Sequence, residues 1–516
     1  MKKELLDKEV LAMYDVRGIQ SYIFKSNKAK EIIGASVLVA DVITKGINSY
    51  IENKKLDKDC YKTIWQEDQE TEFLNNKDIQ MQVMFVGGGN AYVLFRTGDI
   101  CQDVNKYLSR YIMEKTYSLN LAIAVIEKTD SYSKDYESIN EEMRRIKAYM
   151  PSTQPLGALP FMETDSIIGF PLSKEVDGKK YSTESFLKRS VFHDADCGEQ
   201  VFDHMVTEKG DNSMLALCHI DGNSMGSQIK MQMENCEDYL TAIRTMRSIS
   251  LEIAQTFRKT FDDMTQYMDK LSPMVKGNLE NKLYREIIVA GDDITFVCNA
   301  KLAIPAVKFF LKHIGDEKIS YSACGGIAFF NSHFPFSDAY QVAESCCENA
   351  KKCAKEKSHR GKEDKIGNYF DFQMCSNISA SQLETYRQKH YMLNGQLFIG
   401  RPYYVSVEND EYKLNDKNRQ KDVSQLEHWQ KIIYALPRNK AKLLRDSVTM
   451  GESKRVETIT FLNSRGYKEF EMVEEFNNQD ESKEQVWSLW YDATELMDLY
   501  IDEGNLDDGK KQEVRN

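Results

Sequence analysis

Three aspartates stand where short apolar runs break off, and carboxylates so placed could bind a divalent cation. Asp292 and Asp293 lie in "VAGDDITF", at the tip of a predicted hairpin, and Asp221 follows the apolar run "LALCHI". Ionised carboxylates are costly to hold close together unless a cation joins them. Mg²⁺ or Mn²⁺ takes such oxygen ligands together with substrate phosphates. An Asp-Asp pair at a hairpin can also be ordinary turn chemistry, so the pair alone decides nothing.

The chemistry that suits such a cluster is two-metal phosphoryl or nucleotidyl transfer. One cation would activate a ribose hydroxyl and the other would steady the leaving pyrophosphate. Glycines beside the acids would let the backbone approach phosphate closely, and these are Gly222, Gly226 and Gly291. Asn223 and Ser224, in "IDGNSMG", are polar residues that could contact the nucleotide.

The chain repeats its own pattern, and the repeat supplies elements that would position the aspartates. "LAMYDVRGIQSYIF" corresponds to "LALCHIDGNSMGSQI", which places Asp15 at the position of Asp221, 206 residues earlier. "VMFVGGGNAYVLF" corresponds to "IIVAGDDITFVCN", with Asn90 opposite Asp293 at an offset of 203. "LNLAIAVIEK" corresponds to "SACGGIAFFN" at an offset of 204, and an amphipathic helix follows in both copies.

The repeat predicts two copies of a strand–helix–hairpin–strand–helix domain, each an α+β sheet with helices on one face. The second copy carries the acidic tip. The first copy has a neutral tip, so we expect it to bind a nucleotide without catalysing; that tip is Gly87, Gly88, Gly89 and Asn90. The predicted division of the chain is 1–165 for the first copy, 166–205 for a connector, 206–375 for the second copy and 376–516 for a mainly helical C-terminal domain.

Bulk composition narrows the class of protein. The 516 residues are 41% hydrophobic and 29% charged, which is typical of a globular chain with more than one core. No apolar run reaches the length of a membrane span, and no apolar stretch of a signal peptide follows "MKKELLDKEV", so we expect a cytoplasmic protein. The net charge of −12 argues against a surface that binds nucleic acid throughout, but a local basic groove is compatible with it. The eleven cysteines form no CxxC pair, which argues against a disulfide framework or a zinc ribbon.

Several stretches together resemble one family, the large palm-domain subunit of type III CRISPR effector complexes. They fall within about residues 8–405, and they are "DVRGIQSYIFKSNKAKEIIGAS", "HIDGNSMG", "AGDDITF", "SACGGIAFFNSHFPFSDAYQVAE" and "AKKCAK". That family makes cyclic oligoadenylates from ATP and is related to GGDEF diguanylate cyclases. The resemblance implies two ferredoxin-like palm domains packed as a pseudo-dimer. It implies that the metal ligands are Asp221 and Asp293, with Asp292 beside them and a backbone carbonyl from Ile220.

The resemblance also implies roles for the remaining site residues. Lys351 matches a phosphate-contacting lysine, although a solvated helix face is an equally good interpretation of its position. Gly87, Gly88 and Gly89 match a tip that helps to house a second nucleotide.

The chain departs from the family pattern in several places. It starts almost directly at the first copy, so we expect no N-terminal HD nuclease domain, and "HDAD" at 193–196 has no partner metal ligands around it. The cysteine cluster often found between the palms is absent. Ala290 replaces the first glycine of the usual GGDD tip, and Asn223 replaces an aspartate, which could change activity or metal preference.

The leading hypothesis is a metal-dependent nucleotidyltransferase that makes cyclic oligoadenylate second messengers from ATP in antiviral defence. It implies a two-metal site for Mg²⁺ or Mn²⁺, and it allows other effector subunits and guide or target RNA as partners, with no membrane and no DNA. The alternatives are a cyclic dinucleotide synthase and a non-catalytic scaffold subunit of an RNA-guided complex. The retained set of Asp221, Asp292 and Asp293 counts against the scaffold.

Overall fold

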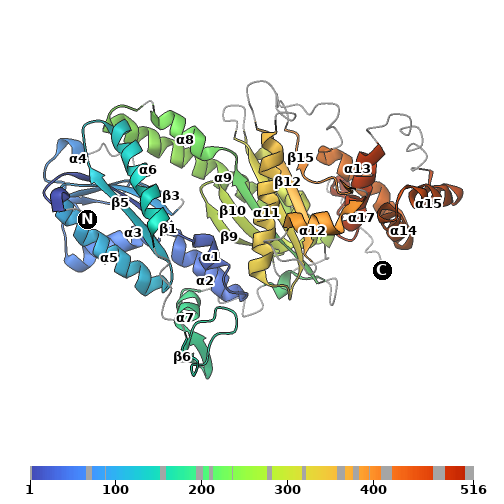
Figure 1. Cartoon of the computed structure of the whole chain (residues 1–516), viewed down its shortest axis with the longest axis horizontal. Helices are drawn as coiled ribbons and strands as arrows, with labels where there is room; N and C mark the ends of the chain where they lie inside the picture. Colours follow the sequence, from blue (N-terminus) through green and yellow to red (C-terminus); the bar gives the residue numbers. More distant parts are fainter. Residues whose placement is uncertain are drawn as a thin grey trace. The chain divides into compact units, whose positions relative to one another are not determined.

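The structure is a computed structural model, shown in Figure 1 with colours that follow the chain. It describes residues 3–65, 72–87, 89–150, 158–192, 202–207, 213–234, 236–275, 282–315, 321–356, 366–375, 383–393, 395–407, 421–468 and 483–505.

The chain forms two compact units, and both are discontinuous in sequence. The first unit comprises Met1–Val201, Ser224–Arg258 and Ile287–Asp293. The second unit comprises Phe202–Asn223, Lys259–Glu286 and Ile294–Asn516. The four-part division predicted from the sequence stays a prediction.

The first unit contains a five-stranded sheet with the strand order β2-β3-β4-β1-β5. Strand β1 lies inside the sheet and pairs antiparallel with both β4 and β5. Its sequence, "VLAMYDVR", is apolar for five residues, and those five residues are buried, because helices cover both of its faces. The strands are β1 (Val10–Arg17), β2 (Tyr61–Lys62), β3 (Met81–Gly87), β4 (Asn90–Phe95) and β5 (Asn120–Glu127).

Helices lie on both faces of this sheet, so the prediction of helices on one face was wrong. Tyr14 points to one face, where its hydroxyl donates to Asn105 on α5 at 2.6 Å. Met13 points to the other face, since side chains alternate along a strand, and it packs in a core with Ile139 and Met143 of α6. The helices of this unit include α1 (Ile19–Ile23), α2 (Ala29–Ala40), α3 (Val42–Lys54), α4 (Glu72–Asn75), α5 (Gly98–Thr116), α6 (Tyr132–Tyr149) and α8 (Met225–Glu234).

The predicted connector contains a hairpin and a helix. Its turn is formed by Asp177 and Gly178, whose φ values of 50° and 73° are those of the tight turns that favour Asp-Gly. Helix α7 begins where the Ser182 side chain accepts a hydrogen bond from the backbone N–H of Ser185. The elements are β6 (Leu172–Val176), β7 (Lys179–Ser182) and α7 (Thr183–Ser190).

A six-stranded sheet belongs mainly to the second unit and has the order β15-β12-β11-β8-β10-β9. Its central strands repeat the order of the first sheet, β5-β1-β4-β3, with the connectivity of a βαββαβ unit. The elements are β8 (Met214–Gly222), α9 (Tyr239–Val275), β9 (Tyr284–Ala290), β10 (Asp293–Asn299), α10 (Ala300–His313), β11 (Ala323–Asn331), α11 (Phe336–Lys355), β12 (Tyr369–Cys375) and β15 (Tyr403–Tyr404).

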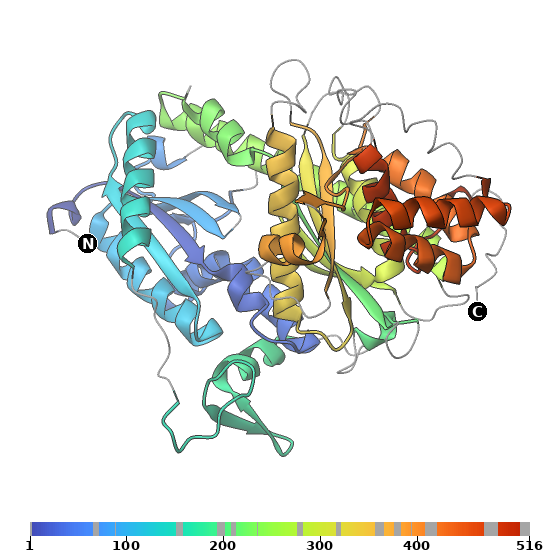
Figure 2. The ribbon, with the colours of Figure 1, turned by 45° about the vertical axis from the view of Figure 1, so that its right-hand side comes forward.

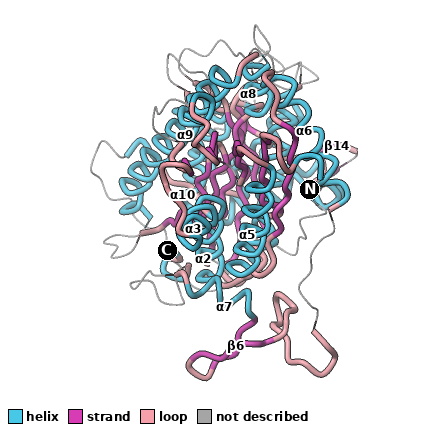
Figure 3. The backbone as a smooth tube through the Cα atoms, turned by 90° about the vertical axis from the view of Figure 1, so that its left-hand side faces the viewer, coloured by secondary structure: helices cyan, strands magenta, loops and turns pink. Residues whose placement is uncertain are grey.

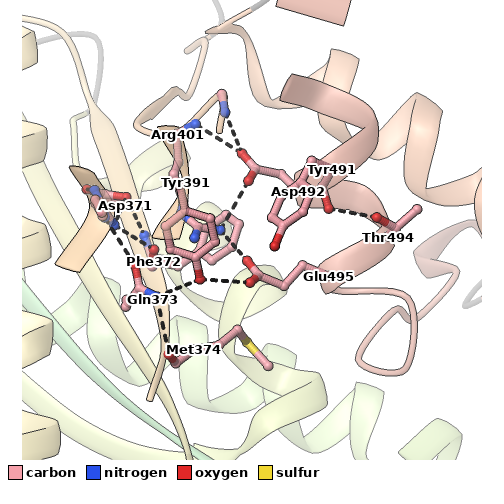
Figure 4. Close-up of polar contacts among 12 residues, drawn as sticks. Asp371, Phe372, Gln373, Met374, Tyr391, Arg401, Tyr491, Asp492, Thr494 and Glu495 are labelled. Carbon is pink, nitrogen blue, oxygen red and sulfur yellow. Dashed lines mark hydrogen bonds and ion pairs between the residues drawn. The ribbon is translucent and has the colours of Figure 1, made fainter. Parts of the chain in front are cut away.

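The C-terminal part is mainly helical and contains buried charges. Arg387 pairs with Asp371 on β12. The buried side chain of Arg401 donates to Asp492 and Glu495 on α17 (Figure 4). The elements are α12 (Leu383–His390), β13 (Met392–Leu393), β14 (Gln396–Leu397), α13 (Val423–Ala435), α14 (Arg438–Thr449), α15 (Glu452–Ser464) and α17 (Lys483–Glu495).

Two further observations bear on the sequence predictions. Among the described residues, no single helix has the length and apolar character of a membrane span, although the bent pair α2–α3 meets those criteria jointly. The ten cysteines in the described part form no disulfide bond, and Cys346, Cys347 and Cys353 are buried as packing residues.

Candidate active site

An aspartate and a lysine meet at the end of β8 in the second unit. Lys351 on α11 donates through its Nζ to Asp221 Oδ2 and, at 3.1 Å, to the carbonyl oxygen of Gly222. The Asp221 side chain is 37% exposed and that of Lys351 is 21% exposed, so the pair is open to solvent on one side. Lys351 therefore does not lie on a solvated helix face: it reaches the predicted metal ligand.

Close packing of α11 on β11 brings the lysine to this place. Gly326 has no room for a side chain, because a Cβ atom there would lie 1.9 Å from the carbonyl oxygen of Ala343. One turn further on, Cys347 donates its S–H to the carbonyl oxygen of Cys324, the residue paired with Asp221 in the sheet. The next turn of the same helix face carries Lys351 to the end of β8. Helix α11 is the yellow helix of Figure 2.

Electrostatics keep this lysine charged and the neighbouring histidine neutral. Burial acts to lower the pKa of Lys351, but the charge and hydrogen bond of Asp221 outweigh it and raise the pKa above its ordinary value. His219, two residues before Asp221, is buried, and burial lowers its pKa. Its Nδ1 shares a 3.0 Å hydrogen bond with the hydroxyl of Thr295 on β10.

The first unit contains the same pair of residue types. Lys147 on α6 donates to Asp15 Oδ2, and Arg17 donates at 3.0 Å to the carbonyl oxygen of Lys147. Lys147 precedes Lys351 by 204 residues, which is the offset of the repeat. Lys147 was not among the predicted site residues, although "MRRIKAYM" aligns with the helix of Lys351 at that offset.

The two hairpin tips differ in charge. In the first unit Asp15 lies opposite Asn90, and the buried Oδ1 of Asn90 has no hydrogen-bond partner among the described residues. Asp293 begins β10, which is the sheet neighbour of β8, and Asp292 lies in the turn before it. Gln20 donates to Asp293 Oδ2 at 3.0 Å. Gly87 ends β3 and Gly89 follows it, whereas Gly88 lies outside the described residues.

The remaining predicted residues surround the end of β8. Ile220 is fully buried and pairs with Gly325. Asn223 is buried and donates to the Ser322 hydroxyl at 3.1 Å and to the Gly367 carbonyl, contacts that hold the loop after β8. Ser224 lies between β8 and α8 with a φ of 58°, Gly226 is in the first turn of α8, and Gly291 is in the turn between β9 and β10.

The donor chemistry of this region fits a hard divalent cation. Within the described ranges, no group of three or more His, Cys, Asp or Glu side chains is gathered closely enough to hold a metal ion. Mg²⁺ is commonly bound by only one or two carboxylates together with substrate phosphates. Asp221 and Asp293, on neighbouring strands, supply such oxygen ligands, so the metal site stays a prediction that the residues present can satisfy.

Together these observations define a duplicated α+β protein with an Asp–Lys pair at the end of the first strand of each copy, β1 and β8. No protein-family model matches the chain. No curated protein matches it either. Solved structures do match it. The apo Csm1-Csm4 cassette has 12% identity and a TM-score of 0.47, with 96% of this chain and 71% of that chain covered.

Two further matches are ligand complexes of the same cassette. The complex with cA4 has 12% identity and a TM-score of 0.45 over 96% of this chain and 70% of that chain. The complex with one ATP has 12% identity and a TM-score of 0.44, with 95% of this chain and 70% of that chain covered. Another matching structure is the Csm1-Csm4 subcomplex in the type III-A CRISPR-Csm interference complex. The resemblance predicted from the sequence is to a subunit of the same type of effector complex that these structures contain. At 12% identity and TM-scores below 0.5, it assigns no activity to this chain.

Proposed function

We propose that this chain is a metal-dependent nucleotidyltransferase that joins ATP into cyclic oligoadenylate second messengers, in a type III CRISPR-like defence system. The observation that carries the proposal is the ion pair between Asp221 and Lys351, held at the open end of β8. The solved relatives include complexes with ATP and cA4, which is compatible with that substrate and product.

The side chains of this region have separable tasks. The charged ammonium of Lys351 can bind a phosphate group, and the Gly222 carbonyl orients it toward the end of the strand. A divalent cation held by Asp221, Asp292 and Asp293 would supply the positive charge that stabilises the transferred phosphoryl group. Because His219 is neutral, it adds no positive charge near the carboxylates, and their negative charge remains available to a cation.

The register around these carboxylates supports a shared site. In the first sheet Met13 lies opposite Tyr92, two positions from the facing residues Asp15 and Asn90. In the second sheet His219 and Thr295 share a hydrogen bond, and they likewise lie two positions from Asp221 and Asp293. The neutral tip of the first copy is suited to hold a nucleotide as reaction partner, and we propose that the two copies act as a palm pseudo-dimer.

The test is product analysis by mass spectrometry after incubation of the full chain with each NTP and Mg²⁺ or Mn²⁺, with and without RNA. Oligoadenylates from ATP are expected, and Asp292→Asn/Asp293→Asn should lower product formation at least about 100-fold without changing the melting temperature. The matched control is Asp59→Asn/Asp78→Asn, two exposed aspartates outside the site. Cyclic dinucleotides would favour the alternative enzyme, and no turnover with any NTP would favour the scaffold.

A second arm tests the lysine itself. Lys351→Ala should reduce turnover about 100-fold, because the phosphate loses a charged hydrogen bond. Lys352→Ala is the matched control, since Lys352 is the next residue of α11 and is exposed. Equal activity of the two variants would refute the phosphate role of Lys351.

A further inference from the structure

A small cavity in the first unit is lined by cationic and aromatic side chains. Its volume is about 340 Å³, and it lies between the β6–β7 turn, α7 and α2; Figure 3 shows β6 and α7 next to each other. Lys30, Lys179 and Arg189 contribute three positive charges, and one carboxylate, from Asp177, faces the same space. The chain as a whole has a net charge of −12, but positive side chains outnumber carboxylates in the lining of this cavity. The cavity is therefore suited to an anion.

The guanidinium of Arg189 is held in a fixed orientation. It lies over the ring of Tyr181, 4.8 Å from the ring centroid, and Glu31 contacts it from behind at 3.5 Å. Glu31 is almost fully buried and accepts hydrogen bonds from Ser26 and Ser185, so its own position is fixed as well. A guanidinium is planar, and stacking on a ring fixes the orientation of that plane, in which the N–H groups can bind phosphate oxygens.

The wall of the cavity is rigid because α7 is docked tightly on α2. A Cβ atom on Gly34 would lie 1.8 Å from the carbonyl oxygen of Lys188, so the two backbones are in direct contact. The buried ammonium of Lys188 donates to the carbonyl oxygen of Tyr22 and to Glu184. A site whose donors are fixed before binding loses less entropy when the ligand arrives.

The rings and the size of the cavity narrow the class of ligand. Tyr181 and Phe186 line the same space and provide apolar surface beside the cations. A volume near 340 Å³ is at the lower end for small-molecule sites, which suits one nucleotide rather than a larger cofactor. Flat bases stack on such rings while the phosphate meets Lys or Arg.

We propose that this cavity binds one phosphorylated nucleotide unit, separately from the candidate catalytic residues. A free mononucleotide and a unit within single-stranded nucleic acid share this chemistry. None of the cavity-lining residues belongs to the set of Asp221, Asp292, Asp293 and Lys351, so the two proposals stand or fall independently.

The test is fluorescence anisotropy of the full chain with a labelled 5′-phosphorylated oligoadenylate, in EDTA so that metal-dependent binding is suppressed. Lys30→Gln/Lys179→Gln should weaken binding about tenfold, roughly threefold for each solvent-accessible cation. Asp177→Asn should tighten binding about two- to threefold, because it removes the one carboxylate that faces the cavity. The matched control is Lys180→Gln on the same strand, which pairs with Glu163 and does not line the cavity.

Competition identifies the source of the unit. If AMP competes as well as the unlabelled oligonucleotide, the site takes free nucleotides; if only the oligonucleotide competes, it takes a nucleic-acid strand, and both results support the proposal. The proposal is overturned if binding does not saturate, or if the double variant binds as the control does. Weaker binding by Asp177→Asn, or inorganic phosphate competing as well as AMP, would also overturn it. Equal melting temperatures of all variants exclude misfolding as the cause.

Discussion

Replacing Arg401 with methionine should destabilise the second unit strongly. Arg401 is fully buried, and its Nη1 donates to Asp492 Oδ1 at 3.1 Å and to Glu495 (Figure 4). Its guanidinium lies over the rings of Phe372 and Tyr391, at 4.3 and 5.2 Å from their centroids. Methionine keeps most of the stacked volume but removes the positive charge that contacts both carboxylates.

The magnitude follows from what the substitution leaves behind. Asp492 would stay fully buried without a countercharge, and breaking a buried pair in this way costs about 3–5 kcal/mol. In the intact protein, burial raises the pKa of Asp492 to about 6, although the charge of Arg401 acts to lower this pKa. Because this pKa lies above the unfolded value of about 3.8, the folded carboxyl binds a proton more tightly than the unfolded one. The contribution of Asp492 to stability is therefore full at low pH and is lost as the pH rises through 6. The variant should therefore lose less stability at pH 5 than at pH 7.5.

The assay is urea unfolding at the two pH values. Arg438→Met is the matched control, because Arg438 and Asp498 form an exposed pair in the same C-terminal part that contributes less than about 1 kcal/mol. The reasoning is refuted if both variants lose the same free energy of unfolding, or if Arg401→Met loses more at pH 5 than at pH 7.5.

Two other predictions test residues that pack beside the candidate active site. Gly326→Ala should cost about 3 kcal/mol or more in urea unfolding, because the new Cβ would overlap the backbone of α11, whereas Gly226→Ala, with open space around it, should cost nothing. His219→Gln should flatten the acid dependence of stability. Because burial holds the histidine neutral when folded, the unfolded chain takes up the proton first below pH 6.5, so stability falls there by up to about 1.4 kcal/mol per pH unit. An unchanged acid slope in the variant would contradict this.

Local patterns predicted the parts of the fold that local residues determine. The apolar runs and the Gly-rich tips placed β8, which contains Asp221 next to its last residue, and β10, which begins at Asp293. The nearly constant offset of the repeat predicted two copies of one domain, and four corresponding strands have the same order in both sheets. The connector hairpin was missed, although "VDGK" carries its own turn signal in Asp177 and Gly178.

Contacts between distant residues could not be predicted in the same way. Arg401 and Asp492 are 91 residues apart, and nothing near either residue indicates its partner. The helices that cover both faces of the first sheet were also missed, because a strand buried on two faces, such as "VLAMY", has no alternation to count. Buried charges and two-sided burial depend on which elements meet, and tertiary packing decides that.

The repeat separates what the fold requires from what the chemistry requires. Both copies keep the Asp–Lys pair, Asp15 with Lys147 and Asp221 with Lys351, so each pair is compatible with the same packing of helix on strand. The facing hairpins differ in charge, with Asn90 in place of Asp293. The first copy forms its hairpin without acids, so turn geometry does not require Asp292 and Asp293. Their charge therefore has a reason other than folding, and binding of a cation with a phosphate substrate provides one.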